Sequence, residues 1–355
     1  MRQRIAALAL LVFVLLLAMP VQAVDLGARA MGMGGAYAAL ANDAAAVYWN
    51  PAGLAEVSVV SVTPVVAVET TARGDLSNFQ KLTGTESNVT LPTGDFTLGA
   101  SGAGLAGIVT KRFGITYLPE ATLSAEFLFR SDPPPEGAEP ISGNGSKFSA
   151  RASIYNDTVV SGALPLAKAP FGLGGVNVGA NLKFIRGRHF SAEKTLEVTE
   201  PGQLGEPVRL NQDSTGNGFG LDLGAQGKLT DKIRFGVVAR DLVNSVSWSG
   251  VVPEPRKPAF QAGVALKAPL GLTLAADLEN AELGGDRATR LRLGLEESLF
   301  GILAVRAGYR TNPGANPSYS VGLGAGLGRF LRVEGALASD LDQQVQACLT
   351  AVAQF

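Results

Sequence analysis

The side chains that most often carry catalysis are scarce in this sequence. Its 355 residues include one histidine, His189, and one cysteine, Cys348. Because His189 falls on an expected outer loop, a Ser-His-Asp triad built elsewhere and a metal site with several histidines are both excluded. Neither a G-x-S-x-G nor a Walker A sequence occurs. The sequence therefore predicts a protein that is not an enzyme and that holds no metal and no cofactor.

One glycine motif has the spacing of a dinucleotide-binding loop. Gly102, Gly104 and Gly107 form the pattern G-x-G-x-x-G. That motif binds a pyrophosphate where a strand turns into a helix, whereas here it lies inside an expected glycine-rich strand. We therefore interpret the match as a coincidence.

Composition narrows the class of protein further. Charged residues make up 17% of the chain, below the roughly 25% of soluble proteins. Past the N-terminus, no apolar run reaches the roughly 18 residues of a membrane-spanning helix. The 30 Lys and Arg residues are matched by 31 Asp and Glu residues, so no basic surface for nucleic acid is expected. These values exclude a helical-bundle membrane protein, a disordered chain and a nucleic-acid-binding protein.

The first residues have the pattern of an export signal. Arg2 and Arg4 precede a continuous apolar stretch over residues 6–19, and Val21-Gln22-Ala23 supplies the small residues that signal peptidase needs. The sequence predicts a signal peptide over residues 1–23 and a mature chain that begins at Val24. An uncleaved anchor is the alternative, but the apolar stretch is short for a membrane span.

Much of the remaining chain alternates between apolar residues and polar or small ones. In residues 291–296, leucines at the odd positions are separated by Arg292, Gly294 and Glu296. The same period of two occurs in residues 176–184, 219–226, 272–279 and 330–337. A period of two predicts strands that have one apolar face and one polar face.

A soluble β-sandwich would also alternate, but three features favour a transmembrane barrel. The expected strands have about 10 to 18 residues, longer than the 5 or 6 usual in globular proteins, and a tilted strand of 9 to 11 residues spans a bilayer. The polar faces carry charges and glycines, as expected for a wet lumen. Aromatic residues gather near strand ends, where barrels have interfacial girdles.

The spacing of these segments predicts fourteen antiparallel strands within residues 56–355. We expect them at 56–69, 95–110, 113–130, 147–163, 172–187, 214–228, 232–243, 259–268, 271–280, 288–298, 301–310, 319–328, 329–338 and 346–355. Long and short connections alternate, as in bacterial outer-membrane barrels, with short turns and both chain ends in the periplasm. The predicted fold is an all-β transmembrane antiparallel β-barrel in contact with outer-membrane lipid. The terminal Phe355 resembles the signal that barrel-assembly machinery recognises.

Residues 24–55, ahead of the first strand, have no face with a period of two. They are rich in alanine, and short helices are expected at Ala36–Leu40 and Asp43–Val47, with Asp43 as an N-cap. A barrel of fourteen strands encloses an open channel unless something fills it. We therefore expect these residues to form a small N-terminal helical plug in the lumen.

The same residues resemble the N-terminal hatch of the FadL-type outer-membrane transporters, and more closely that of the related PorV/PorQ and UPF0164 groups. The matching pieces are Gly27-Ala28-Arg29, Met33-Gly34-Gly35-Ala36, Asn42-Asp43-Ala44 and Asn50-Pro51-Ala52-Gly53. The resemblance implies a hatch, or gate, that includes Asn50, Pro51, Ala52 and Gly53. The residues alone also predict a local role, because Asn-Pro favours a turn at the end of a helix.

One irregularity lies in the expected third strand, residues 113–130. Pro119-Glu120 interrupts it, and a proline removes a hydrogen-bond donor from the ladder. In FadL-type proteins a kink in the third strand opens the wall toward the lipid, so the resemblance implies that Pro119 and Glu120 mark such a lateral opening. A tight turn that divides the stretch into two short strands is the alternative, but it would break the alternation of loops.

Two functions from different classes follow from the resemblance. The first is an outer-membrane channel for passive uptake of hydrophobic small molecules such as long-chain fatty acids, which enter the lumen and leave sideways into the bilayer. Burial of apolar surface, at roughly 25 cal/mol per Å², would drive capture. The second is a PorV-like outer-membrane component of type IX protein secretion, with no small-molecule substrate. The expected partners are therefore hydrophobic small molecules or lipids in the first case and cargo proteins in the second.

Overall fold

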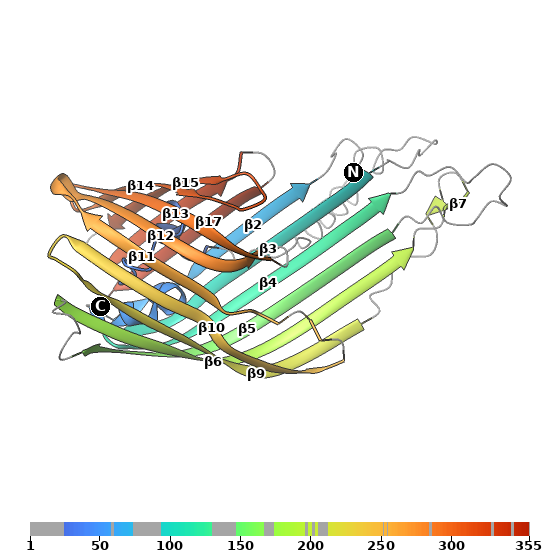
Figure 1. The fold of residues 1–355 in the computed structure, drawn as a ribbon, viewed down its shortest axis with the longest axis horizontal. Helices are drawn as coiled ribbons and strands as arrows, with labels where there is room; N and C mark the ends of the chain where they lie inside the picture. The colour runs from blue at the N-terminus through green and yellow to red at the C-terminus, as the bar shows by residue number, and fades with distance from the viewer. Residues whose placement is uncertain are drawn as a thin grey trace.

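The alternating segments pair into one antiparallel sheet that closes on itself (Figure 1). The computed structural model describes residues 25–57, 60–73, 94–129, 147–166, 174–195, 198–200, 203–204, 212–250, 252–253, 255–283, 286–327, 330–341 and 344–354. The predicted signal peptide, residues 1–23, lies outside these ranges. Within them, no helix has both the length and the apolar character needed to cross a membrane.

The barrel has fourteen strands when β1 (Ser61–Val62) and β2 (Val65–Arg73) are counted as one. Both pair with β17 (Gln344–Gln354) on one side and with β3 (Gly94–Thr110) on the other, which joins the first strand to the last. The strands between them are β4 (Phe113–Phe129), β5 (Lys147–Leu166), β6 (Gly174–Thr195), β9 (Gln212–Lys228), β10 (Ile233–Ser249), β11 (Ala259–Lys267), β12 (Leu272–Leu283), β13 (Asp286–Leu299), β14 (Leu303–Arg310), β15 (Ser318–Leu327) and β16 (Leu331–Ser339). A separate short pair consists of β7 (Val198–Glu200) and β8 (Gln203–Leu204), and a one-turn 3-10 helix, η3 (Pro269–Gly271), links β11 to β12.

Each strand directs one row of side chains outward and the other into the lumen. In β17, Gln346 and Cys348 are buried, whereas Val345 and Leu349 are 53% and 61% exposed. Most of the large exposed apolar side chains lie on such outward rows, which is the arrangement that contact with lipid requires. The closed single sheet confirms the predicted all-β barrel and excludes two sheets packed face to face.

The predicted strands are present, but several of their ends differ. The first begins at Ser61 and not at residue 56, because Pro51–Glu56 form a 3-10 helix, η1. β6 continues to Thr195, so His189 lies in a strand and not in an outer loop, and its Nδ1 is 2.9 Å from Ser153 Oγ. The last residues of β6 are mostly polar or glycine. No apolar row marks this end of the strand in the sequence, so the predicted strand ended too early.

The N-terminal segment, residues 25–57, lies within the barrel against its inner wall (Figure 1). Its helices are α2 (Ala28–Gly32) and α3 (Ala46–Trp49), whereas the sequence predicts helices at 36–40 and 43–47. Residues 36–40 are not helical because the wall binds their backbone groups in place of an intrahelical ladder. Asp43 accepts a hydrogen bond from Ala45 N at 3.0 Å, one turn before α3 and not as its N-cap.

Large side chains of the N-terminal segment form the core of the lumen. Tyr37 and Trp49 are almost fully buried, and their rings meet edge to face at 6.2 Å between centroids. Trp49 Nε1 donates to Leu26 O at 2.6 Å, which satisfies its polar group. α2 contacts β14 to β17, while η1 contacts β4, β5, β6 and β9. The segment therefore touches the wall on two sides.

Candidate functional site

Asn50 connects the N-terminal segment to the barrel wall. Its backbone is extended after α3, and its Oδ1 caps η1 by accepting from Ala52 N at 3.2 Å. Its Nδ2 donates to Ala38 O at 2.9 Å and to Ala225 O of β9 at 3.1 Å. An asparagine suits this fully buried position because one short side chain both donates and accepts.

Glycines of the wall make room for Asn50 and Pro51. A Cβ atom on Gly224 of β9 would lie 2.1 Å from Asn50 Oδ1, and one on Gly179 of β6 would lie 2.4 Å from the carbonyl carbon of Pro51. Gly53 is similarly confined, because a Cβ there would lie 2.0 Å from Ala41 O. The sequence predicts inward glycines as a sign of a wet lumen. At Gly179 and Gly224 they instead allow the backbone of the N-terminal segment to approach the strands.

Polar side chains of the wall bind the backbone of the N-terminal segment. Asp277 Oδ2 accepts from Tyr37 N at 2.9 Å and from Ala38 N at 2.8 Å. Buried backbone groups outside regular structure need partners of this kind. Six more wall side chains act in the same way: Gln226 and Arg234 on Ala39 O, Gln261 on Gly35 O, Asn181 on Val47 O, Ser320 on Gly34 N and Gly32 O, and Thr350 on Ala28 N.

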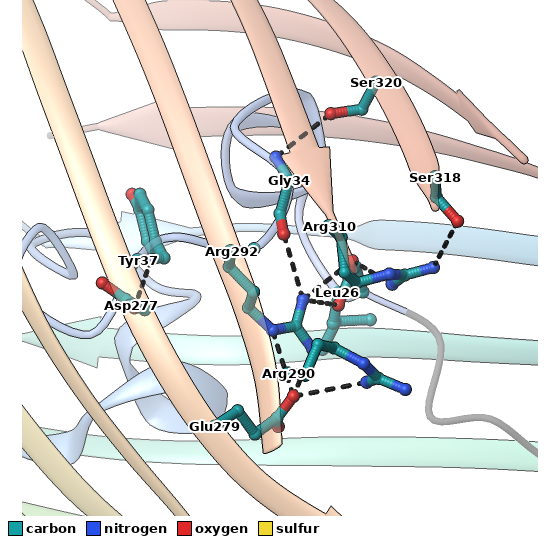
Figure 2. Close-up of polar contacts among 12 residues, drawn as sticks. Leu26, Gly34, Tyr37, Asp277, Glu279, Arg290, Arg292, Arg310, Ser318 and Ser320 are labelled. Atoms are coloured by element: carbon teal, nitrogen blue, oxygen red, sulfur yellow. Dashed lines mark hydrogen bonds and ion pairs between the residues drawn. The ribbon is translucent and has the colours of Figure 1, made fainter. Parts of the chain in front are cut away.

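A group of buried charges holds the start of the segment (Figure 2). Asp25 accepts from Arg292 Nη1 at 3.0 Å and from Arg310 Nη1 at 2.8 Å. Glu279 accepts from Arg292 Nη2 at 2.7 Å and from Arg290 Nη1 at 3.3 Å. Arg240 pairs with the other carboxylate oxygen of Glu279. We call this set the Asp25 cluster: Asp25, Arg240, Glu279, Arg290, Arg292 and Arg310.

Asp25 is negatively charged in this cluster. Burial raises the pKa of its carboxyl, but Arg292 and Arg310 lower it more, so the pKa lies below its ordinary value of 3.8. Buried charges persist only when they are paired, and the wall arginines provide that pairing. Several donors of the cluster have no hydrogen-bond partner among the described residues: Nε and Nη2 of Arg290, Nη1 of Arg240 and Nε of Arg310.

A second ionic group binds α2 to the wall. Arg29 Nη2 is 2.8 Å from Glu296 Oε1, and Arg306 Nε is 2.7 Å from Glu296 Oε2. Arg306 Nη2 continues the chain to Glu334 Oε1 at 2.8 Å. These residues belong to α2, β13, β14 and β16, so the group ties the helix to three strands.

Pro119 and Glu120 lie within the single continuous strand β4. Its ladder with β5 is unbroken at this point, and Pro119 is opposite Asn156. Its ladder with β3 has no pairs between Ala103–Glu120 and Ala106–Tyr117, although the register is the same on both sides of the gap. A missing proline N–H is a sufficient reason for such a gap.

Beside this gap, the inner surface is apolar at Leu105 of β3 and Leu118 of β4. It is charged at Glu120, farther along β4. Leu105 is buried, and Ala103 and Leu118 pack against the same core as Tyr48 of the N-terminal segment. Glu120 Oε2 is 2.8 Å from Arg256 Nη2, and Arg256 Nη1 is 2.6 Å from Asp157 Oδ2. 

Arg256 attaches an outer connection to the lumen. It comes from residues 255–258, and its guanidinium lies 4.1 Å from the ring centroid of Tyr155. Burial lowers the pKa of Arg256, but Glu120 and Asp157 raise it more, so the side chain keeps its charge. The connection between β10 and β11 is thus held against the inner faces of β4 and β5.

The predicted residues Pro51, Ala52 and Gly53 all lie in η1, which contacts β4, the strand of Pro119 and Glu120. The Asp25 cluster was not predicted. A pattern for it does exist, because Glu279, Arg292 and Arg310 each lie seven residues from the strand end at a short turn (279 − 272, 299 − 292 and 310 − 303). Charges at equal depth on neighbouring strands indicate a shared layer on the inner wall.

Solved structures have this architecture at low sequence identity. The Pseudomonas putida toluene transporter TodX has a TM-score of 0.58 and 15% identity, with 93% of this chain and 98% of that chain covered. The CymD monoaromatic hydrocarbon channel has a TM-score of 0.55 and 14% identity, with 93% and 98% covered. A Pseudomonas aeruginosa FadL homologue has a TM-score of 0.52 and 14% identity, with 95% and 100% covered.

The fold is that of the FadL-type channels. No protein-family profile matches the chain, and no curated protein matches it either. The FadL-type neighbours are transporters and channels, in agreement with the expectation of a protein that is not an enzyme. Within the described ranges, no group of three or more His, Cys, Asp and Glu side chains is arranged to hold a metal ion.

Proposed function

We propose that this protein is an outer-membrane channel for hydrophobic small molecules such as long-chain fatty acids. The observation that carries the proposal is the closed fourteen-strand barrel of FadL-type fold, with apolar side chains on its outward rows. The neighbours transport toluene or conduct monoaromatic hydrocarbons, which supports a hydrophobic ligand. Such a barrel contacts outer-membrane lipid, and barrel-assembly machinery would insert it.

The N-terminal segment is, in this proposal, the plug of the barrel, and Asn50–Gly53 are part of its hatch. Two ionic groups, seven wall side chains on its backbone and the glycines beside Asn50 and Pro51 all hold it in place. A ligand that moved straight through the lumen would have to break these buried contacts. Buried ion pairs that lose one partner cost about 3–5 kcal/mol each, so a straight path is unfavourable.

A sideways path through the gap beside Pro119 requires less disruption. The ladder between β3 and β4 already has no pairs there. The inner surface next to the gap is apolar, with Leu105 and Leu118 on it. A hydrophobic ligand in the lumen would therefore leave through the wall between β3 and β4 and enter the bilayer. Glu120, bound to Arg256, would border this exit on its charged side.

The Asp25 cluster favours an acidic amphiphile over a neutral hydrocarbon as the ligand. Nε and Nη2 of Arg290 have no acceptor among the described residues, and they point to a missing one. A carboxylate would supply it, since guanidinium groups bind carboxylates through paired hydrogen bonds. This feature supports a fatty acid, with its chain on the apolar core and its head group at Arg290.

Uptake by cells that express the full-length protein tests the proposal. Cells lacking their own transporters would be given radiolabelled oleate or toluene. We expect oleate uptake in cells with the wild-type protein and several-fold lower uptake with Pro119→Ala, which restores a ladder donor. The matched control is Pro165→Ala, because Pro165 also lies in a barrel strand, at the end of β5 and away from the gap. Equal uptake in all three strains and in empty cells would contradict the proposal.

Mass spectrometry of the purified protein separates this function from a PorV-like role in protein secretion. A channel for fatty acids is expected to retain acidic lipids through purification. A preparation without bound lipid, but with a protein partner in equal amount, would instead favour the secretion component.

A further inference from the structure

The outer surface of the described barrel has an open hollow of about 610 Å³, lined by three polar side chains and two aromatic ones. We call it the outer hollow. It is formed by Tyr117 of β4, Asn156 and Thr158 of β5, and Phe184 and Arg186 of β6. These residues are neighbours in register, because Tyr117 is opposite Thr158, Thr158 is opposite Phe184, and Asn156 is opposite Arg186. The outer hollow is therefore a built feature of three strands.

All of these side chains point away from the lumen. On β5, Asp157 and Val159 are buried inside the barrel, so Asn156 and Thr158 between and beside them face outward. On β6, Lys183 and Ile185 are buried, whereas Phe184 is 51% exposed and Arg186 is also exposed. The surface that the outer hollow indents is thus the one that faces lipid.

Polar residues are unusual at this place on the outward rows. On β5, the outward neighbours of Asn156 and Thr158 are Ile154 on one side and Val160 on the other, and both are apolar. A barrel surface in contact with acyl chains is expected to be apolar, and an arginine there is costly. The polar side chains therefore need a polar partner from the membrane itself.

One end of the outer hollow reaches the level of lipid head groups. A tilted strand crosses a bilayer in about 9 to 11 residues. Counted from the short turn between β5 and β6, Asn156 is 10 residues from Leu166, and Arg186 is 12 residues from Gly174 (166 − 156 and 186 − 174). By the same count Tyr117 is only 4 residues from Phe113, at the short turn between β3 and β4 (117 − 113). The outer hollow therefore extends along the wall from within the bilayer, and Asn156 and Arg186 lie at its end nearer the long loops.

The polar groups of the outer hollow are mainly donors. Tyr117 donates its hydroxyl hydrogen to Asn156 Oδ1, so the two N–H groups of Asn156 remain for another acceptor. Arg186 forms no ion pair with any described carboxylate. An acceptor with several oxygens and a negative charge would satisfy both residues, and phosphate has these properties.

We propose that the outer hollow binds the phosphate group of a phospholipid in the surrounding membrane. Arg186 and Asn156 bind the phosphate oxygens, and Thr158 adds a hydroxyl donor. The acyl chains lie along Phe184 and Leu182, which are nearer the bilayer centre and are 51% and 44% exposed. This site is on the outer face of β4 to β6, whereas the wall residues of the Asp25 cluster are on the inner face of β10 and β12 to β14, so it does not depend on transport through the lumen.

Native mass spectrometry of the full-length barrel in detergent tests the proposal. The probes are dioleoylphosphatidylglycerol, oleate and inorganic phosphate, each titrated separately. We expect saturable binding of phosphatidylglycerol and a roughly tenfold weaker affinity in Arg186→Gln, since a hydrogen bond to a charged group is worth about 1.5 kcal/mol or more. Tyr117→Phe, which removes only the hydroxyl that orients Asn156, should weaken binding by a smaller factor.

Arg188→Gln is the matched control. Arg188 also faces outward on β6 and loses the same charge, but it lies over Phe190 and does not line the outer hollow. Its affinity for phosphatidylglycerol should stay within about twofold of wild type, and the heat-dependent gel shift of folded barrels would verify that each variant folds. Equal losses in Arg186→Gln and Arg188→Gln, or none in either, would overturn the proposal. Preferential binding of oleate or of inorganic phosphate at Arg186 would also overturn the assignment to a phospholipid.

Discussion

Arg292 Nη1 lies 3.0 Å from Asp25 Oδ1, and this contact joins the start of the N-terminal segment to the middle of β13. The same guanidinium reaches Glu279 at 2.7 Å and Gly34 O at 3.1 Å. One wall arginine thus holds two parts of the segment and a neighbouring strand. If the segment is a plug, this arginine is one of its main fixing points.

Replacement of Asp25 by Asn should loosen the N-terminal segment. The variant removes the charge that pairs with Arg292 and Arg310, and loss of one partner from a buried ion pair costs roughly 3–5 kcal/mol. We expect faster cleavage of the segment by an added protease and a lower midpoint of guanidinium unfolding. The control is Asp231→Asn, since Asp231 is exposed in the turn between β9 and β10. Equal behaviour of the two variants would contradict the role given to Asp25.

The contribution of Asp25 should depend on pH only in acid. Because the pKa of Asp25 in the folded protein is below its ordinary value of 3.8, the stabilisation is complete above that value. It is lost as the pH falls through the lower pKa of the folded state. The difference in unfolding midpoint between wild type and Asp25→Asn should therefore be constant from about pH 8 to 5. A difference that already shrinks between pH 7 and 5 would show that Asp25 is not held by the two arginines.

Gly224→Ala tests whether the wall is shaped for the N-terminal segment. The new Cβ would lie 2.1 Å from Asn50 Oδ1 and 3.0 Å from Pro51 Cδ, and overpacking of this kind costs about 1–3 kcal/mol. We expect a lower unfolding midpoint and greater protease sensitivity of the segment. Gly162→Ala is the control, because a Cβ at that position would have no atom within 4 Å. It should leave both measurements unchanged.

The effects of Gly224→Ala and Asn50→Ala should not add. Asn50→Ala removes the donor to Ala225 O and the cap of η1, at a cost of about 1–3 kcal/mol. It also removes the oxygen that the methyl group of Gly224→Ala would meet. The double variant should therefore be more stable than the sum of the single changes predicts. Strict additivity in unfolding experiments would indicate that the two residues are not in contact.

The barrel was predictable because contact with lipid on one face constrains the residues of each strand separately. A strand with one face in lipid must alternate, and residues such as Leu291, Arg292 and Leu293 record that directly in the sequence. The closure and the strand count follow from the number of such segments and their loops. The short helices of the N-terminal segment were predicted at the wrong positions, because Asp277 and Arg234 of the wall determine its backbone and lie far away in the sequence.

The charged contacts of the lumen were not predictable from one element alone. Each pair joins residues that are distant in the chain, such as Asp25 and Arg310. The period of two shows that Arg310 faces inward, but not which partner it meets. The irregularity at Pro119 was predictable because a proline removes a hydrogen-bond donor from any strand in which it lies. Whether it opens the wall depends on the pairing with β3, which the sequence does not contain.

Arg256→Gln should release the outer connection between β10 and β11 from the lumen. The change leaves the buried carboxylate of Asp157 and the half-buried one of Glu120 without their cation, and an unpaired buried acceptor costs about 1–3 kcal/mol. Arg256→Lys keeps the charge but cannot reach both carboxylates with two parallel donors or stack flat on Tyr155, so its effect should be intermediate. Hydrogen exchange of the amides at positions 256 and 257, which lie between Pro255 and Pro258, measures the release. The expected order is Gln, then Lys, then wild type from fastest to slowest. If Arg256 borders the exit, oleate uptake should change in the same order, whereas identical exchange in all three proteins would mean that these ion pairs do not hold the connection.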